Sequence, residues 1–512
     1  SKKRLRMTQQ KTTAMILGNF RYKNTTVKTR RIILVAIFFI LSPFARAEKN
    51  TSLIDAVNMQ NLPMFRLLID QGANVNQAET DGTRALHWAV HHDNISIAKQ
   101  LIAAGANVNA KNRYEVAALS LAANNGNTDM VNLLLDAGAD INTTMSESEF
   151  VLLTAARTGV ADVVQLLLDR GAEINATETW RGQTALMWAA AEENLEVVNL
   201  LLSRGANIDA RSEKGFTALL FAAREGHTKI VDTLLNHGAN ISESLPARAG
   251  IITENGTGTA TQTGLNALLL ATGSAHFETA SLLLDAGANP NHSPLGWTAL
   301  HQISWVRKMG QSGSNNPTPQ GSGKLGSLDF VRELVEHGAN LDALVSGRPP
   351  VGVSSLNMEG STPFLLASRS ADVELLRLLI DLGADPKIPN TDNSTPLMVA
   401  AGLGTESPGE DPGTESEVLE SVKYILSLGS DINAVDDRGN TAMHGAAYKH
   451  LPSVVTYLSE RGAEISIWDQ ENEFGHTPLL IAEGIHRGMN IVSSKITELA
   501  ILEILDRFPL PK

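Results

Sequence analysis

Apolar and small residues recur along most of the chain in short stretches that have the spacing of amphipathic helices. Between residues 217 and 237, one alanine- and leucine-rich stretch follows Thr217 and stops at Gly226, and a second carries Ile230 and Leu234 on one side. A threonine hydroxyl can cap the start of a helix, and a glycine can end it in a left-handed turn. The pattern predicts a pair of short helices, which can bury their apolar sides only by stacking on further pairs.

One leucine-rich phrase ending in Gly-Ala repeats along the chain with a nearly constant period. Its first six glycines are spaced by 33 or 34 residues, and they are Gly72, Gly105, Gly138, Gly171, Gly205 and Gly238. Later glycines continue the phrase with spacings of 33 to 51 residues, at Gly287, Gly338, Gly383, Gly429 and Gly462. A last unit, 476–508, lacks the phrase, so about twelve units occupy 51–508. A fixed period of this length predicts a repeat solenoid.

The longer spacings indicate the same unit carrying insertions. Two insertions fall between the second helix of one unit and the first helix of the next, near 242–263 and 344–359. Three others fall between the two helices of one unit, near 309–327, 402–417 and 484–494. The 309–327 segment is rich in Gly, Ser, Asn and Pro, which predicts a mobile loop. Such loops either are neutral padding, because long surface loops cost little stability, or enlarge a binding surface.

Several units begin with a phrase of the form Thr-Pro-Leu-His-x-Ala-Ala. Close versions are Thr395-Pro-Leu-Met-Val-Ala-Ala, Thr362-Pro-Phe-Leu-Leu-Ala and Thr298-Ala-Leu-His301. Together with the 33-residue period, this phrase resembles the ankyrin repeat. The resemblance implies one all-α domain over 48–512, an ankyrin-repeat solenoid of about twelve helix-turn-helix units with short β-hairpin fingers. It also implies that His87, His301 and His444 are structural residues bonding across units.

The first 47 residues have the order of a signal peptide. They contain eleven Lys and Arg and no acidic residue, and Arg30 and Arg31 precede the apolar run Ile32–Leu41 and an Ala-x-Ala end at Ala47. The run is too short to cross a bilayer as a helix, which needs about 20 residues. We therefore expect cleavage after Ala47 and export to the periplasm or the exterior. The alternative is an uncleaved anchor that tethers the chain to a membrane.

Charge and composition narrow the choice of partner. Without residues 1–47, 31 basic and 55 acidic residues remain, a net charge of about −24. Such a surface repels nucleic acid, whose binding requires neutralisation of phosphates, and favours a protein partner with basic patches. The chain has no cysteine, which excludes disulfides and thiolate metal sites. We expect a monomer that does not associate with membrane after the signal is removed.

No motif of a catalytic or cofactor site is present in the sequence. The stretch Gly321-Ser-Gly-Lys324 imitates a phosphate-binding loop, but Thr318 stands where that motif needs glycine and Leu325 where it needs Ser or Thr. The adjacent pair His91-His92 could contribute to a metal corner, although neighbours on a helix point in different directions. We predict a non-enzymatic chain without cofactor or metal, and the alternative is a repeat frame that supports a metal or enzymatic site.

The resemblance also implies which residues meet a partner protein. In the family pattern, the residues after Ala-Ala in the first helix and the hairpin residues before Thr face the concave side. The first helices then contribute His91, His92, Asn124, Asn125, Arg157, Thr158, Glu192, Arg224, Glu225, Trp305, Arg369, Tyr448 and Lys449. The hairpins contribute Arg113, Tyr114, Trp180, Arg181, Lys214, Phe216 and Trp297. The set is rich in Arg, Trp and Tyr, which dominate protein interfaces. The nearby insertion leaves open whether Trp305 begins a loop instead.

Overall fold

The computed structural model describes residues 52–145, 149–246, 264–308, 319–347, 349, 354–409, 411–487 and 490–507. The predicted signal peptide therefore lies outside the described residues. The chain divides into two compact units at residues 74 and 75. In the first unit, helix α3 (Leu53–Asn58) packs against helix α4 (Leu62–Asp70), and α3 begins with a capping box in which Ser52 and Asp55 bond reciprocally.

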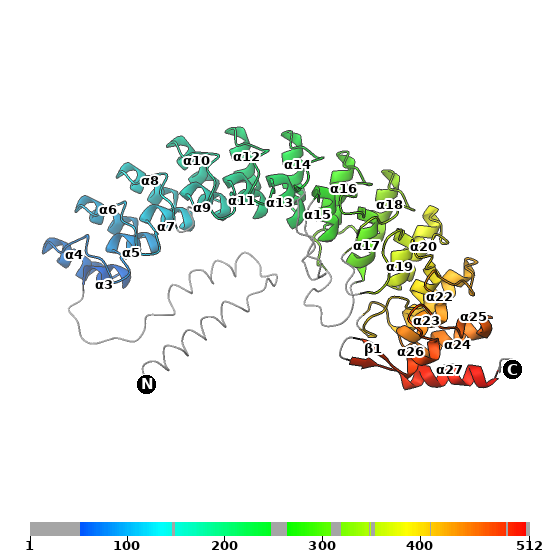
Figure 1. The fold of residues 1–512 in the computed structure, drawn as a ribbon. Helices are drawn as coiled ribbons and strands as arrows, with labels where there is room; N and C mark the ends of the chain where they lie inside the picture. Colours follow the sequence, from blue (N-terminus) through cyan, green and yellow to red (C-terminus); the bar gives the residue numbers. More distant parts are fainter. Residues whose placement is uncertain are drawn as a thin grey trace, which may run out of the picture. The chain divides into compact units, whose positions relative to one another are not determined.

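The second unit contains eleven helix pairs among its described residues. The first helices are α5 (Ala85–His91), α7 (Ala118–Asn125), α9 (Val151–Thr158), α11 (Ala185–Ala191), α13 (Ala218–Glu225), α15 (Ala267–Gly273), α17 (Ala299–Arg307), α19 (Pro363–Arg369), α21 (Pro396–Ala400), α23 (Ala442–Tyr448) and α26 (Pro478–Glu483). The second helices are α6 (Ile95–Ala103), α8 (Thr128–Asp136), α10 (Ala161–Asp169), α12 (Leu195–Ser203), α14 (Thr228–Asn236), α16 (Phe277–Asp285), α18 (Ser327–Glu336), α20 (Val373–Leu382), α22 (Glu415–Ser427), α24 (Pro452–Glu460) and α27 (Lys495–Arg507). Over most of this unit the first helices form one layer and the second helices another (Figure 1). With the pair in the first unit, the described residues contain the twelve pairs that the period predicts.

The pair α13–α14 shows why these residues form helices. Thr217 caps α13 by accepting a hydrogen bond from the amide of Leu220, and Gly226 ends it at φ 77°. Ala222 and Ala223 have no exposed surface, so their small side chains let α13 approach α11 and α15 closely. The sequence prediction for this unit is confirmed.

The three histidines of the first-helix phrase link successive repeats. The Nδ1 atom of His301 accepts a hydrogen bond from the amide of Thr298, which leaves the proton on Nε2. Nε2 then donates to the carbonyl of Ala343, 2.9 Å away in the next unit. His87 and His444 make the same pair of bonds, with Nδ1 accepting inside the unit and Nε2 bonding to a carbonyl of the next unit. The predicted structural role across units is confirmed.

The asparagine at the end of the Gly-Ala phrase also joins neighbouring repeats. The side chain of Asn76 donates to the carbonyl of Gly105 and accepts from the amide of Asn107, at 2.9 and 2.7 Å. Asn109 repeats both bonds one unit later with Gly138 and Asp140. The phrase therefore recurs because it closes one helix and fixes the next repeat in position.

The described parts of the 309–327 and 402–417 insertions contact the repeats, whereas 309–318 and 247–263 lie outside the described residues. Ser322, in the insertion between α17 and α18, donates to the carbonyl of Gly226, 96 residues away. The insertion between α21 and α22 ends before Glu415, where α22 begins. The insertion between α26 and α27 forms an antiparallel pair of strands, β1 (Ile485–Arg487) and β2 (Asn490–Val492), which the sequence did not predict.

Short connections between pairs have hairpin character. Isolated antiparallel bridges join Ala78 to Arg84 and Lys111 to Ala117, just before the first helix of each unit. One further short helix, α25 (Ile465–Trp468), follows α24. No helix in the described part of the chain combines the length and apolar character that spanning a bilayer requires.

Candidate protein-binding surface

Buried polar side chains shape the hairpin tips. The carboxylate of Glu178 is 5% exposed and accepts hydrogen bonds from the amides of Trp180 and Arg181, at 2.6 and 2.7 Å. Asn112 does the same for the amides of Tyr114 and Val116, at 3.0 and 3.1 Å. These hydrogen bonds hold the backbone of each tip against the repeat below it. The side chains of Trp180 and Tyr114 then point outward from an ordered turn.

Two of these tips present an arginine stacked on an exposed aromatic ring. The guanidinium of Arg181 lies 3.7 Å from the ring centroid of Trp180, and that tryptophan is 56% exposed. Arg113 lies 4.9 Å from the ring centroid of Tyr114 and donates a 2.7 Å hydrogen bond to its hydroxyl. Tyr114 is 46% exposed. Such pairs are large, amphipathic and already ordered, so they lose little entropy when a partner contacts them.

The predicted first-helix positions of the N-terminal repeats (75–246) reach the surface. Exposed side chains are Asn124, Asn125 and Glu225, together with the hairpin residue Lys214. Half-buried ones are His91, His92, Arg157, Thr158, Glu192 and Arg224. Arg224 pairs with Glu225 at 2.7 Å, and Arg157 with Glu149 at 3.5 Å. The surface therefore combines charged pairs with amides and aromatic rings.

Five predicted contact residues are buried, and their prediction as partner contacts is corrected. Phe216 packs 4.9 Å from the ring of Phe221, and Arg224 lies over both rings. Trp297 and Trp305 pack edge to face at 6.1 Å, and α17 continues through Trp305 to Arg307. The exposed fractions are 5% for Phe216, 5% for Trp297, 8% for Trp305, 9% for Tyr448 and 6% for Lys449.

In the C-terminal repeats (264–507), an insertion covers the ends of the first helices. The ammonium group of Lys449 donates to the carbonyl of Pro412 at 2.7 Å, and Arg369 forms an ion pair with Asp411 at 3.1 Å. Burial lowers the pKa of Lys449 to about 8 and lowers the pKa of Arg369. These two predicted contact residues hold the insertion in place, because both cations are enclosed by it. Family spacing cannot reveal this, since insertions lie outside the family pattern.

The same region contains a pocket that the sequence analysis missed. Its volume is about 260 Å³, and it is lined by Ser355, Leu356, Asn357, Asp392, Ser394, Leu403, Gly404, Glu406, Asp436, Arg438, Asn440, Tyr448, Phe474, His476 and Ile485. Its lining residues come from three hairpins and three insertions, and the hydroxyl of Ser354 donates to the carbonyl of Gly404 at 2.8 Å. The sequence feature that could have drawn attention to this region is the polar residue at equivalent hairpin positions of three successive units, Asn390, Asp436 and Asn472.

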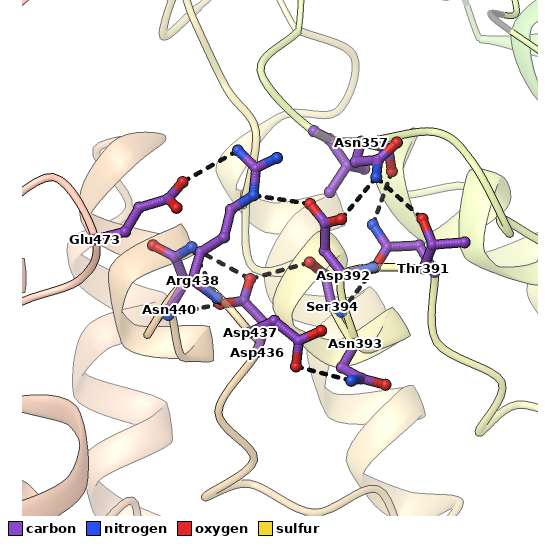
Figure 2. Close-up of polar contacts among 12 residues, drawn as sticks. Asn357, Thr391, Asp392, Asn393, Ser394, Asp436, Asp437, Arg438, Asn440 and Glu473 are labelled. Carbon is purple, nitrogen blue, oxygen red and sulfur yellow. Dashed lines mark hydrogen bonds and ion pairs between the residues drawn. The ribbon is translucent and has the colours of Figure 1, made fainter.

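Figure 2 shows the polar network beside this pocket. The guanidinium of Arg438 lies between two carboxylates, with Nε 2.8 Å from Asp392 and Nη1 3.2 Å from Glu473. Asp436 accepts from the hydroxyl of Ser394 at 3.0 Å and from the amide of Asn440 at 2.7 Å. The side chains are held by neighbouring hairpins, so the network ties successive repeats together.

The histidines and carboxylates of the described residues were the candidates for a metal site. No group of three or more His, Asp or Glu residues that could hold a metal occurs in the part of the chain that the structure describes. His91 and His92 lie with their ring centroids 5.1 Å apart and contact Trp88 at 5.8 and 6.0 Å. Both histidines therefore pack with an aromatic ring on the helix surface.

Family models for ankyrin repeats match several parts of the sequence. A model of three copies matches 34–112, 119–212 and 152–244, the first of which begins inside the predicted signal peptide. A many-copy model matches 415–458, and a single-repeat model matches 359–391. The chain belongs to the ankyrin-repeat family. The predicted fold class, an all-α ankyrin solenoid, is confirmed.

Known ankyrin-repeat proteins match parts of this chain. Ankyrin repeat, SAM and basic leucine zipper domain-containing protein 1 of Dasypus novemcinctus is 32% identical over 139 residues, which cover 27% of this chain and 25% of the relative. Ankyrin repeat and SOCS box protein 16 of Homo sapiens is 30% identical over 237 residues, which cover 36% of this chain and 51% of the relative. This ankyrin-repeat chain thus spans between about a quarter and a half of the length of these two relatives.

A solved structure is also similar. The human ASB11 ankyrin repeat domain has 25% sequence identity and a TM-score of 0.40, and the match covers 47% of this chain and 100% of that domain.

Proposed function

We propose that this ankyrin-repeat protein is a non-catalytic scaffold that binds a partner protein. The contact surface is made by the hairpin tips and first-helix ends of the N-terminal repeats, which correspond to the concave face of the family. Ankyrin repeats support this role in general, and the chain's composition adds an acidic balance of −13 that favours a partner with basic patches.

The observation that carries the proposal is the pair of rigid arginine-on-aromatic tips, Arg113 on Tyr114 and Arg181 on Trp180. Aromatic and arginine side chains supply most of the binding energy at protein interfaces. A buried tryptophan would stabilise the fold. Trp180 is 56% exposed, so it contributes little to the stability of the fold. These side chains are exposed on tips whose backbone amides bind Glu178 and Asn112, and recognition explains them better than packing does.

The test begins with affinity capture from the source cell, followed by mass spectrometry to identify the partner. Binding of the purified partner is then measured for the triple variant Tyr114→Ala, Trp180→Ala and Arg181→Ala. We expect affinity to fall by at least about 2 kcal/mol with little change in melting, because hot-spot residues are removed and no core is touched.

A matched control removes exposed apolar area away from this surface. Ile496 and Leu499 on α27 are 71% and 53% exposed, and the double change to alanine should leave affinity unchanged. If the control weakens binding and the triple variant does not, the wrong surface has been chosen.

We also propose that the chain is exported and that its first 47 residues are removed. The support is the basic segment, the apolar run Ile32–Leu41 and the Ala-x-Ala end. Intact-mass analysis of protein recovered from the native host should give a chain that begins at Glu48. A chain that keeps the apolar run and fractionates with membrane would establish the tethered alternative.

A further inference from the structure

Most arginines of the N-terminal repeats have a carboxylate partner. Five of them form ion pairs in the described residues, with oxygens 2.7 to 3.5 Å away, and these are Arg157, Arg170, Arg204, Arg211 and Arg224. Arg84 instead donates from Nε to the carbonyl of Asn76 at 3.2 Å. Acidic residues outnumber basic ones in the chain, 55 to 42, so carboxylates are plentiful.

The two remaining arginines of these repeats stand at the exposed hairpin tips. Arg113 and Arg181 form no ion pair in the described part of the chain, and each lies over the aromatic ring beside it. The carboxylate of Asp81 acts on Arg113 from beyond ion-pair distance and accepts a hydrogen bond from the amide of Thr83 at 2.9 Å. Arg113 is exposed and Arg181 is half-buried, so a carboxylate from outside the chain can reach both guanidinium groups.

Stacking on a ring leaves the N–H edges of a guanidinium group available. The group has five N–H donors in one plane, and an aromatic ring covers its face and not its edge. Arg113 uses one donor on the hydroxyl of Tyr114 at 2.7 Å, and the side chain of Arg181 makes no hydrogen bond to any described residue. A carboxylate can accept two parallel N–H bonds from such an edge. The tips therefore lack the one group that pairs best with them.

The two tips are held at a fixed separation. Helices α7, α9 and α11 pack side by side, so the tips that precede α7 and α11 are two repeats apart (Figure 1). Helices pack with their axes about 8–10 Å apart, which places these tips roughly 16–20 Å from each other. Each tip also bonds to a neighbouring tip, because the amide of Arg113 donates to the carbonyl of Asp81 and the amide of Glu213 to that of Arg181, both at 2.8 Å. An extended chain covers this distance in about six residues.

We propose that these tips bind an extended acidic segment of the partner protein, in which two carboxylates about six residues apart pair with Arg113 and Arg181. The exposed rings of Tyr114 and Trp180 contact the apolar stems of the same acidic side chains. The proposal rests on the proposed scaffold function and deepens it, because it names the chemistry of the partner at that surface. The net negative charge of the whole chain still favours basic patches elsewhere on the partner.

The test uses the full chain and three capped, fluorescein-labelled peptides of glycine and serine, with binding measured by fluorescence polarisation. The first peptide carries two glutamates six positions apart, the second carries two glutamines at those positions, and the third carries two adjacent glutamates. At low salt, we expect the first to bind about tenfold more tightly than the second and about threefold more tightly than the third, because only the first reaches both guanidinium groups. Equal binding of the first peptide and either of the others, or no measurable binding of the first, would overturn the proposal.

Two variants locate the binding. Arg113→Gln and Arg181→Gln should each weaken the first peptide by about threefold and leave the glutamine peptide unchanged. Both side chains lie at the surface, so the repeats should stay folded, which circular dichroism checks. The matched control is Arg204→Gln, which removes an arginine of the same repeats that already pairs with Asp169 at 2.7 Å and should have no effect.

If Arg204→Gln weakens the first peptide as much as the tip variants do, the attraction is general and the tips are not the site. The partner itself separates this inference from the scaffold function. Loss of partner affinity in the Tyr114, Trp180 and Arg181 variant, with full affinity in the double variant Arg113→Gln and Arg181→Gln, would overturn the acidic segment alone. Unchanged partner affinity in both variants would overturn the proposed contact surface and this inference with it.

Discussion

The N-terminal and C-terminal repeats use the same helix phrase but treat the ends of their first helices differently. In α7, Asn124 and Asn125 end the helix and are exposed. In α23, the equivalent Tyr448 and Lys449 are 9% and 6% exposed, beneath the insertion that follows α21. The packing phrase therefore sets the helices, and the insertions decide which part of the surface stays open to a partner.

Ion pairs follow the same division. Arg170 and Asp136 join two N-terminal repeats at 2.7 Å, with 36% and 57% of their side chains exposed. Arg307 and Asp372 join two C-terminal repeats at 2.6 Å, with 14% and 1% exposed. Water screens the first pair, whereas the second has lost most of its hydration and depends on its partner.

The largest effect is expected from Asp372→Ala. This change removes the ion pair with Arg307 and the cap of α20, where Asp372 accepts from the amide of Leu375 at 3.2 Å. Arg307 would keep only the exposed Glu374 as an anionic partner in the described contacts. We expect a loss of about 3–5 kcal/mol of local stability, because a buried charge is left without its partner. Hydrogen exchange of α17 to α20 measures it.

The comparison variant is Asp136→Ala, which breaks the exposed pair with Arg170. It should cost less than about 1 kcal/mol, and added salt should shrink that cost further. Equal losses in the two variants would show that the two kinds of repeat are not held differently.

The next largest effect is a loss of stability on acidification. We expect this loss in the units whose first helix carries a buried histidine, such as His301 or His444. Burial lowers the pKa of His301 and of His444 to about 4, from an ordinary value of 6.5. Between about pH 6.5 and pH 4, these histidines are therefore protonated in the unfolded chain and neutral in the folded chain. Stability is complete above about pH 6.5, falls as the pH drops toward 4, and levels off below that, with a loss of up to about 3 kcal/mol for each histidine.

Urea unfolding between pH 7 and pH 5 tests this in a range where most carboxylates stay ionised. Exchange in α17 and α23 should rise faster than in α11, whose equivalent position is Met187. A uniform response across all repeats would contradict a role for the buried histidines.

Most of the fold could be predicted because the residues within each unit specify its two helices and their packing. Thr217, Gly226 and the Ala-Ala pair specify a helix start, a helix end and a close approach, and the 33-residue period then gives the stack. The strands β1 and β2 could not be predicted, since their six residues lack a strong alternating pattern and pair only within the insertion.

The candidate surface was predictable only where no insertion intervenes. Family spacing placed Tyr114 and Trp180 at hairpin tips, where both are exposed. It failed for Trp297, because α17 supplies Trp305 to pack against it. The pocket could not be predicted from the sequence. Its lining residues Leu356, Leu403 and Phe474 belong to three separate segments, and the conformations of the insertions bring these segments together.

The smallest effect is the loss of stability when a glycine that ends a second helix is replaced. It tests whether the N-terminal and C-terminal repeats have the same local stability away from the insertions. Gly238 and Gly429 end second helices in the N-terminal and C-terminal repeats, at φ 91° and 83°. An added Cβ would meet no atom within 4 Å at either position, so only the left-handed backbone conformation demands glycine. Changing either to alanine should cost about 1–2 kcal/mol, and changing it to asparagine less, because asparagine tolerates this conformation. Local urea unfolding should give equal losses for Gly238→Ala and Gly429→Ala. A much larger loss at Gly429 would mean that the C-terminal repeats differ throughout, and that the insertions alone do not explain the difference between the two surfaces.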